Sequence, residues 1–186
     1  QTMFAAAVKE FGTVDILASN AGMEKNAPFH EMSVAQWDQV MNVNLRGAFL
    51  CAREAVREFL RRGVRPEVSV AAGKIIFTSS VHEVIPWAGH VNYAASKGGI
   101  VGMTLPIARD LARNGIRNMT IAPGIFGTPM MFGMPKEVQE ALAASVPFPS
   151  RLGTPADYAK LVKHIIENDM LNGEVIRLDG AIRLAP

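Results

Sequence analysis

The chain alternates short apolar stretches with longer segments of helical periodicity. Four stretches, at residues 14–19, 74–80, 116–122 and 174–179, have the length and composition of buried β-strands. Helical segments separate them, so successive strands are joined by crossovers rather than by hairpins. Such crossovers are right-handed and produce a parallel sheet with helices on both faces. The order of elements therefore predicts an α/β fold with a doubly wound parallel sheet, in a single domain over residues 1–186.

The helical segments carry their own start signals. Ser33 begins an S-x-x-Q capping box, and residues 34–62 continue as one long helix. A second helix is predicted over residues 93–114. Thr154 followed by Pro155 predicts the start of another, because threonine caps helices and proline suits their first position.

Composition and charge exclude several classes of partner. The chain has 19 basic and 17 acidic residues and no run of five like charges, so neither a nucleic-acid track nor a membrane-surface patch is indicated. Cys51 is the single cysteine, which excludes a disulfide framework within the chain. No apolar run reaches the roughly 18 residues that span a bilayer, and no signal-peptide pattern begins the sequence. We therefore expect a small-molecule partner and a cytoplasmic location.

Polar and glycine residues follow three of the predicted strands. In a doubly wound sheet, ligands bind outside the carboxyl ends of the strands. Asn20, Ser80 and the pair Pro123 and Gly124 stand at those ends. We expect them to lie along one edge of the sheet, where a site is formed.

A tyrosine and a lysine stand where they can act together at this edge. Tyr93 and Lys97 are four residues apart and project from one face of the predicted helix. A phenol has a pKa near 10, and lowering it toward 7 takes roughly 4 kcal/mol of stabilisation of the phenolate. The Lys97 ammonium and the helix N-terminus can supply part of it. The Ser80 hydroxyl can hydrogen-bond a reacting alcohol or carbonyl.

Five motifs in order extend this pattern over nearly the whole chain. They are "SNAG", "VNLRG", "TSS", "YAASK" thirteen residues after Ser80, and "APGIFGTP". Together they resemble the short-chain dehydrogenase/reductase family. The resemblance implies a Rossmann-like sheet, NAD or NADP as cofactor, and hydride transfer between that cofactor and a secondary alcohol or ketone.

The resemblance also implies roles for individual residues. Tyr93 would be the general acid and base, and Ser80 would orient the substrate. Lys97 would lower the pKa of the tyrosine and hold the nicotinamide ribose. Asn44 of "VNLRG" would anchor a water that relays protons through Lys97.

Cofactor contacts and subunit contacts follow from the same resemblance. The residues expected to bind the cofactor, besides Tyr93 and Lys97, are Asn20, Ala21 and Gly22 on its adenosine side and Pro123, Gly124 and Thr128 on its nicotinamide side. The helices over 34–62 and 93–114 would form the contacts of a homotetramer or dimer.

The two halves of the chain point to different substrates. Residues 1 to about 95 resemble bacterial glucose 1-dehydrogenases, and the rest resemble short-chain 3-hydroxyacyl-CoA dehydrogenases, also known as 17β-hydroxysteroid dehydrogenase type 10. A chimera joined at "SKGG" is therefore one hypothesis. The segment from Ile125 to about Arg151, expected to close the pocket, is rich in Phe, Met, Pro and Ala. Because buried sugar hydroxyls need hydrogen-bond partners, this segment favours a hydrophobic or 3-hydroxyacyl-CoA substrate over glucose.

Two features suggest other classes of protein. No strand followed by a glycine-rich phosphate turn precedes residue 14, so we expect the N-terminal strands of the fold to be missing, and a non-catalytic fragment or assembly module is the alternative. The stretch "HEVIP" begins like a zinc motif, but Pro86 opposes the required helix, so no metal is expected. His82, Trp87 and His90 are expected either to line the mouth of the substrate site or to stabilise a loop.

Overall fold

The fold is a parallel sheet between helices, seen in a computed structural model that describes residues 2–183. The strands are β1 (Ile16–Ser19), β2 (Gly73–Thr78), β3 (Ile116–Pro123) and β4 (Val175–Leu178). All neighbours pair in parallel, in the spatial order β1-β2-β3-β4. The predicted α/β fold with a parallel sheet is confirmed.

Seven α-helices are described, together with four shorter helical turns. The helices are α1 (Thr2–Phe11), α2 (Val34–Met41), α3 (Gly47–Arg62), α4 (Val91–Leu111), α5 (Pro129–Phe132), α6 (Lys136–Ala144) and α7 (Pro155–Glu167). The turns are η1 (Phe29–Glu31), η2 (Asn42–Arg46), η3 (Val81–Glu83) and η4 (Ala112–Asn114). No helix among the described residues is long and apolar enough to cross a bilayer.

Both capping predictions are confirmed. The Ser33 and Thr154 side chains each accept from the backbone N–H three residues on, and both form complete capping boxes. These hydrogen bonds satisfy backbone donors that have no partner inside a helix.

Several predicted boundaries are wrong in detail, and the first strand begins at Ile16 rather than at residue 14. The helix over 34–62 is interrupted by the π turn η2, where Gly47 N–H bonds the Asn42 carbonyl. The helix predicted over 93–114 begins earlier, at Val91, and its last residues form the 3-10 turn η4. The strand predicted over 74–80 ends at Thr78, and Ser80 instead caps the turn η3.

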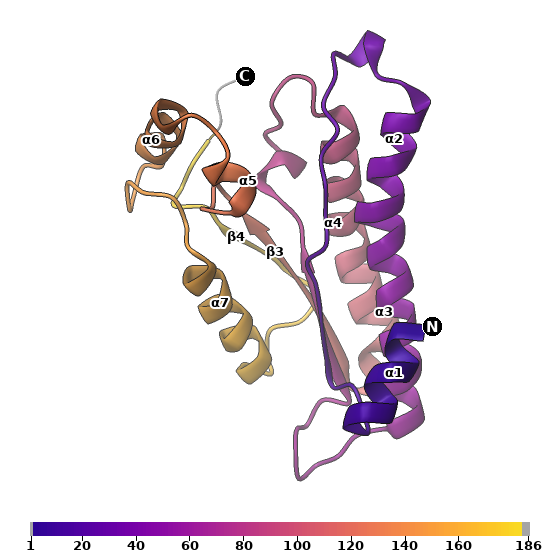
Figure 1. The fold of residues 1–186 in the computed structure, drawn as a ribbon. Coiled ribbons are helices and arrows are strands. Elements are labelled where there is room, and N and C mark those ends of the chain that lie inside the picture. The colour runs from indigo at the N-terminus through magenta and orange to yellow at the C-terminus, as the bar shows by residue number, and fades with distance from the viewer. Residues whose placement is uncertain (1, 184–186) are drawn as a thin grey trace.

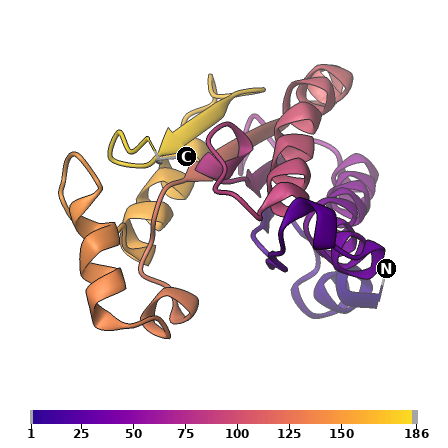
Figure 2. The same cartoon turned by 90° about the horizontal axis from the view of Figure 1, so that it is seen from above.

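Two apolar clusters bury the two faces of the sheet. On one face, α3 and α4 pack on β2 and β3 through Ala55, Phe59 and Ile100, against Ile75 and Phe77. On the other face, Ile165 of α7 packs on Ile76, Met119 and Ile121. Figure 1 shows α7 on one side of the sheet and α2, α3 and α4 on the other. In the view from above, α5 and α6 stand well apart from α2 to α4 (Figure 2).

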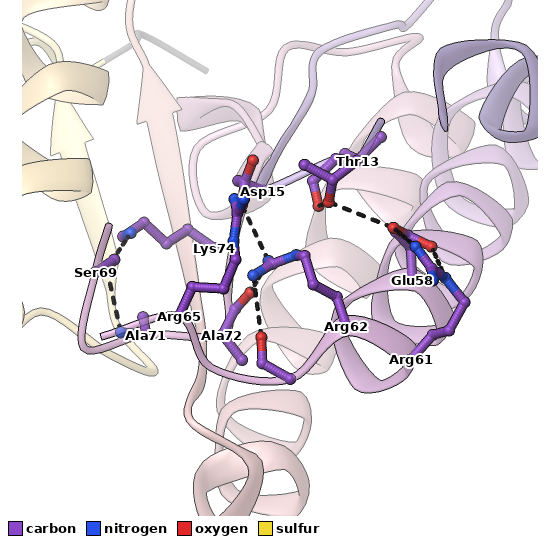
Figure 3. A network of polar contacts seen from close by, with 12 residues as sticks. Thr13, Asp15, Glu58, Arg61, Arg62, Arg65, Ser69, Ala71, Ala72 and Lys74 are labelled. Atoms are coloured by element: carbon purple, nitrogen blue, oxygen red, sulfur yellow. Dashed lines mark hydrogen bonds and ion pairs between the residues drawn. The ribbon is translucent and has the colours of Figure 1, made fainter. Parts of the chain in front are cut away.

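Ion pairs hold the loop between α3 and β2 against the amino end of the sheet. The carboxylate of Asp15 accepts from Arg62 (3.0 Å) and from Arg65 (2.6 Å), and Lys74 Nζ donates to Ser69 Oγ (2.8 Å), as Figure 3 shows. Burial lowers the pKa of Lys74. These contacts lie at the end of the strands opposite the candidate site, so we assign them a structural role.

Candidate active site

A cavity of about 460 Å³ opens at the carboxyl ends of the strands. Its lining includes most of the residues that the sequence placed there: Asn20, Gly22, Ser80, Tyr93, Lys97, Pro123, Gly124 and Thr128. Two predicted residues do not line it. Ala21 is exposed, and Asn44 is fully buried.

Lys97 is buried at the base of the cavity. Its Nζ donates a hydrogen bond to the Thr78 carbonyl at the end of β2 (2.8 Å) and lies 5.5 Å from the centre of the Tyr93 ring. Burial lowers the pKa of Lys97 to about 8, against the opposing charges of Glu24 and Glu83. The hydrogen bond to the Thr78 carbonyl therefore fixes the position of this buried side chain.

Tyr93 lies in the third position of α4. Burial raises its pKa to about 12, and the Ser80 hydroxyl, which favours the phenolate, offsets only part of that rise. The expected lowering by Lys97 is therefore not seen within the protein itself. The reason is that the loss of water around the phenolate outweighs the hydrogen bond from Ser80, and the charge of Glu24 raises the pKa further.

Ser80 is held by the turn that it caps. Its Oγ accepts from the His82 backbone N–H (3.2 Å), and the residue is 8% exposed. The neighbouring Ser79 donates to the Lys97 carbonyl (3.1 Å) and is also bonded to Glu83. These bonds fasten the end of β2 to α4, which brings Ser80 and Tyr93 to the same cavity.

Asn44 joins three segments beneath the cavity. Its Oδ1 accepts from Met23 N–H (2.8 Å), and its Nδ2 donates to the Met23 carbonyl (2.9 Å) and to Ser96 Oγ (3.0 Å). A Cβ on Gly22 would lie 3.4 Å from Lys97 Nζ and 3.5 Å from Asn44 Oδ1. Both hydrogens of the Asn44 side-chain amide are used in these bonds. Any water that Asn44 anchors must therefore donate a hydrogen bond to an oxygen of Asn44 instead.

Comparison with known proteins identifies the family. Residues 1–139 match the family model described as short chain dehydrogenase. The chain belongs to the short-chain dehydrogenase family. Its members are oxidoreductases, so this protein is an enzyme of that class, and the family implies a nicotinamide cofactor.

Relatives within the short-chain dehydrogenase family cover the whole chain. Human 3-hydroxyacyl-CoA dehydrogenase type-2 is 50% identical over 192 residues, which span 100% of this chain and 73% of the relative. The protein of the same name from Drosophila melanogaster is 43% identical, over 95% of this chain and 71% of the relative. The similarity therefore extends across "SKGG" into both halves of the chain.

A solved structure shows the same fold. The crystal structure of 3-hydroxyacyl-CoA dehydrogenase type-2 from Mycobacterium avium superposes with a TM-score of 0.91 at 30% identity, over 100% of this chain and 74% of that chain. The Rossmann-like architecture expected from the motifs is thus confirmed.

Further residues of the cavity carry no short-range signal in the sequence. Tyr158 of α7 reaches the cavity, and its hydroxyl lies 2.5 Å from Thr78 Oγ1. Glu24, in the segment after β1, also lines the cavity. Of the three residues that the sequence offered for the mouth of the site, His82 and Trp87 line the cavity, whereas His90 is not among the described residues that line it. Tyr158 is read from the sequence as an ordinary residue of an amphipathic helix, and only the packing of α7 on the sheet brings it to the site.

The prediction that the segment from Ile125 to about Arg151 closes the pocket is only partly correct. Ile125, Phe126, Met131 and Met134 line the cavity, but in the described structure residues 135–151 do not. Instead Leu142 and Val146 pack behind the cavity wall, in an apolar cluster with Ile125 and Ile182. The first third of the segment therefore forms the wall, and the remainder supports it.

Gly124 is required by a close approach of two strands. A Cβ at this position would lie 2.8 Å from the Asp179 Cα, and its N–H donates to the Leu178 carbonyl (2.9 Å). Thr128, four residues on, caps α5 through a 3.4 Å bond from Met131 N–H.

Proposed function

We propose that this short-chain dehydrogenase interconverts 3-hydroxyacyl and 3-ketoacyl thioesters with a nicotinamide cofactor. The observation that carries the proposal is the cavity in which Ser80, Tyr93 and Lys97 face a wall made of Ile125, Phe126, Met131 and Met134. An apolar wall suits an acyl chain and leaves sugar hydroxyls without partners. The names of the relatives, which share up to 50% identity over the whole chain, support the same substrate class.

Ketone reduction requires one proton and one hydride at the carbonyl. The pKa of Tyr93 is raised to about 12 by burial, so its hydroxyl is protonated at neutral pH and can donate the proton to the carbonyl oxygen. Ser80 Oγ would donate a hydrogen bond to the same oxygen and hold it in place. In the reverse direction Tyr93 accepts the proton from the alcohol.

The residues present fit a nicotinamide cofactor. Lys97 presents a buried ammonium whose contacts include one protein carbonyl, that of Thr78, which leaves donors for ribose hydroxyls. Gly22 lies close to Lys97 and Asn44, and because it has no side chain, its backbone is open to a ligand beside them. Asn20, Gly22, Pro123, Gly124 and Thr128 would complete the contacts, and Ala21 would contribute from outside the cavity. When bound, the cofactor supplies or accepts the hydride.

The test compares substrates and cofactors in the purified protein. We expect a higher kcat/KM for acetoacetyl-CoA than for glucose, measured with NAD(H) and with NADP(H). More efficient oxidation of glucose would reverse the assignment and favour glucose 1-dehydrogenase activity. Absence of saturable NADH binding in a fluorescence titration would contradict the cofactor assignment.

Tyrosine variants test the proton donor. Tyr93→Phe should lower kcat by about 10² or more and leave NADH affinity within a few-fold, since the hydroxyl acts in proton transfer. Tyr158→Phe makes the same chemical change elsewhere on the cavity wall and should cost far less. Activity of Tyr93→Phe above about a tenth of the parent would contradict the assignment.

A further inference from the structure

His82 is a polar side chain of the cavity that the proposed chemistry does not use. It lines the cavity beside Ser80 and is 7% exposed. Its ring is enclosed by three aromatic rings in edge-on contact, with centroid distances of 4.9 Å to Trp87, 5.2 Å to His90 and 5.6 Å to Tyr93. The ring is therefore held in one place next to the proton donor.

Several other polar side chains of the cavity are already engaged by the protein. The Thr78 hydroxyl is paired with that of Tyr158 (2.5 Å), and Ser79 is bonded to Glu83 and to the Lys97 carbonyl. The Glu24 carboxylate lies 3.6 Å from His90 Nε2. His82 differs, because its Nδ1 is buried with no hydrogen-bond partner in the described part of the chain.

The burial of Nδ1 selects a tautomer. A proton on Nδ1 would be a buried donor with nothing to accept it, which is more costly than a bare nitrogen lone pair. The proton of a neutral ring is therefore best placed on Nε2. Burial lowers the pKa of His82, His90 adds to this and Glu24 opposes it, so the ring is neutral at neutral pH. His82 thus offers one N–H donor from the wall of the cavity.

We propose that His82 is a specificity-determining residue whose Nε2–H donates a hydrogen bond to a second substrate oxygen, the thioester carbonyl beside the reacting ketone. This inference rests on the proposed function. The reacting oxygen is taken by Ser80 and Tyr93, and His82 is packed against Tyr93 and bonded through its backbone to Ser80 Oγ. The two oxygens of a 3-ketoacyl thioester stand on alternate carbons, so a donor adjacent to the reacting site can reach the second one.

The experiment pairs two variants with two substrates. His82→Phe keeps an aromatic ring against Trp87, His90 and Tyr93 but removes the donor, and His82→Gln restores an amide N–H near the Nε2 position. The substrates are acetoacetyl-CoA and its thioether analogue, in which a methylene replaces the thioester carbonyl. Each protein is assayed for kcat/KM in the reduction of both ketones.

We expect His82→Phe to lose about tenfold or more in kcat/KM for acetoacetyl-CoA and less than about threefold for the thioether ketone, because only the former offers the second oxygen. His82→Gln should recover most of the loss. If the role of His82 were purely structural, His82→Phe would lower kcat/KM for both substrates by a similar factor. That result would overturn the proposal.

The outcomes also separate this inference from the proposed function. If the parent protein reduces acetoacetyl-CoA and His82→Phe does so equally well, the function stands and the role of His82 is wrong. If the parent reduces the thioether ketone but not acetoacetyl-CoA, the proposed substrate class is wrong and the role of His82 falls with it. Should His82→Phe fail to fold, His82→Leu replaces it in the same comparison with His82→Gln.

Discussion

Burial moves the two ionisable groups of the site in opposite directions. It lowers the pKa of Lys97 to about 8 and raises that of Tyr93 to about 12, because in both cases it disfavours the charged form. At neutral pH the pair is therefore an ammonium beside a protonated phenol. This is the state that donates a proton to a carbonyl, so the protein alone is poised for reduction.

The buried ammonium of Lys97 makes stability depend on pH. Between pH 8 and about 10.5 the folded protein releases a proton that the unfolded chain still holds, so stability rises with pH, by at most about 1.4 kcal/mol per unit from this group. We expect Lys97→Met to lack this contribution. The free energy of unfolding of Lys97→Met, measured in urea, should therefore fall further below that of the parent protein as the pH rises from 8 to 10.

The contributions of other titrating groups to stability cancel when the parent and Lys97→Met are compared at each pH. Parallel curves for the parent and Lys97→Met over this range would contradict the assigned burial. Above pH 10 the sign reverses for Tyr93, whose raised pKa means that the unfolded chain loses its proton first and stability falls.

Two short turns position part of the site, and two longer helices supply the rest. The π turn η2 places Asn44 between Met23 and Ser96, and the turn η3 places Ser80 and His82 on the cavity. π turns inserted in α-helices are often found at functional sites. The helices α4 and α7 then supply Tyr93, Lys97 and Tyr158.

The capping box of α7 offers a direct test at the level of an element. Thr154 Oγ1 accepts from Asp157 N–H (3.2 Å), and the Asp157 carboxylate also binds Arg151 (2.7 Å). Thr154→Val keeps the shape but loses the cap, which costs about 1 kcal/mol. We expect Tm to fall by roughly 2–4 °C in calorimetry.

A matched control for this cap is available at α2. Ser33→Ala removes the equivalent hydroxyl there and should cost a similar amount. A Tm of Thr154→Val within about 1 °C of the parent would mean that α7 is held by its apolar packing on the sheet rather than by the cap.

At the scale of the whole molecule, apolar side chains are exposed on the side of the sheet that α3 and α4 cover. Phe49 is 45% exposed and Leu50 is 37% exposed on α3, and Leu105 on α4 is 50% exposed. Large apolar side chains exposed in this way are found on surfaces that another protein covers. We propose that copies of this chain associate through α3 and α4 as a homotetramer or dimer.

Light scattering after size exclusion measures this association. The parent protein should have a mass of two or four chains. Phe49→Asp should reduce this mass, because a carboxylate in an apolar interface has no partner. Val68→Asp, which changes an apolar residue that is 60% exposed in the loop before β2, should leave the mass unchanged. A monomeric parent would contradict the proposal.

The sequence by itself determined the parallel order of strands and helices, because that order follows from the alternation of local periodicities along the chain. It also determined that Ser80, Tyr93 and Lys97 meet, since residues four apart share a helix face and strand ends share an edge. It did not determine the π turn at Asn44, the arrival of Tyr158 at the cavity or the enclosure of His82 by three rings. Each of these depends on contacts between residues far apart in the chain. The pKa of Tyr93 belongs with them, because desolvation is set by everything that packs around the phenol, and only the tertiary structure fixes that.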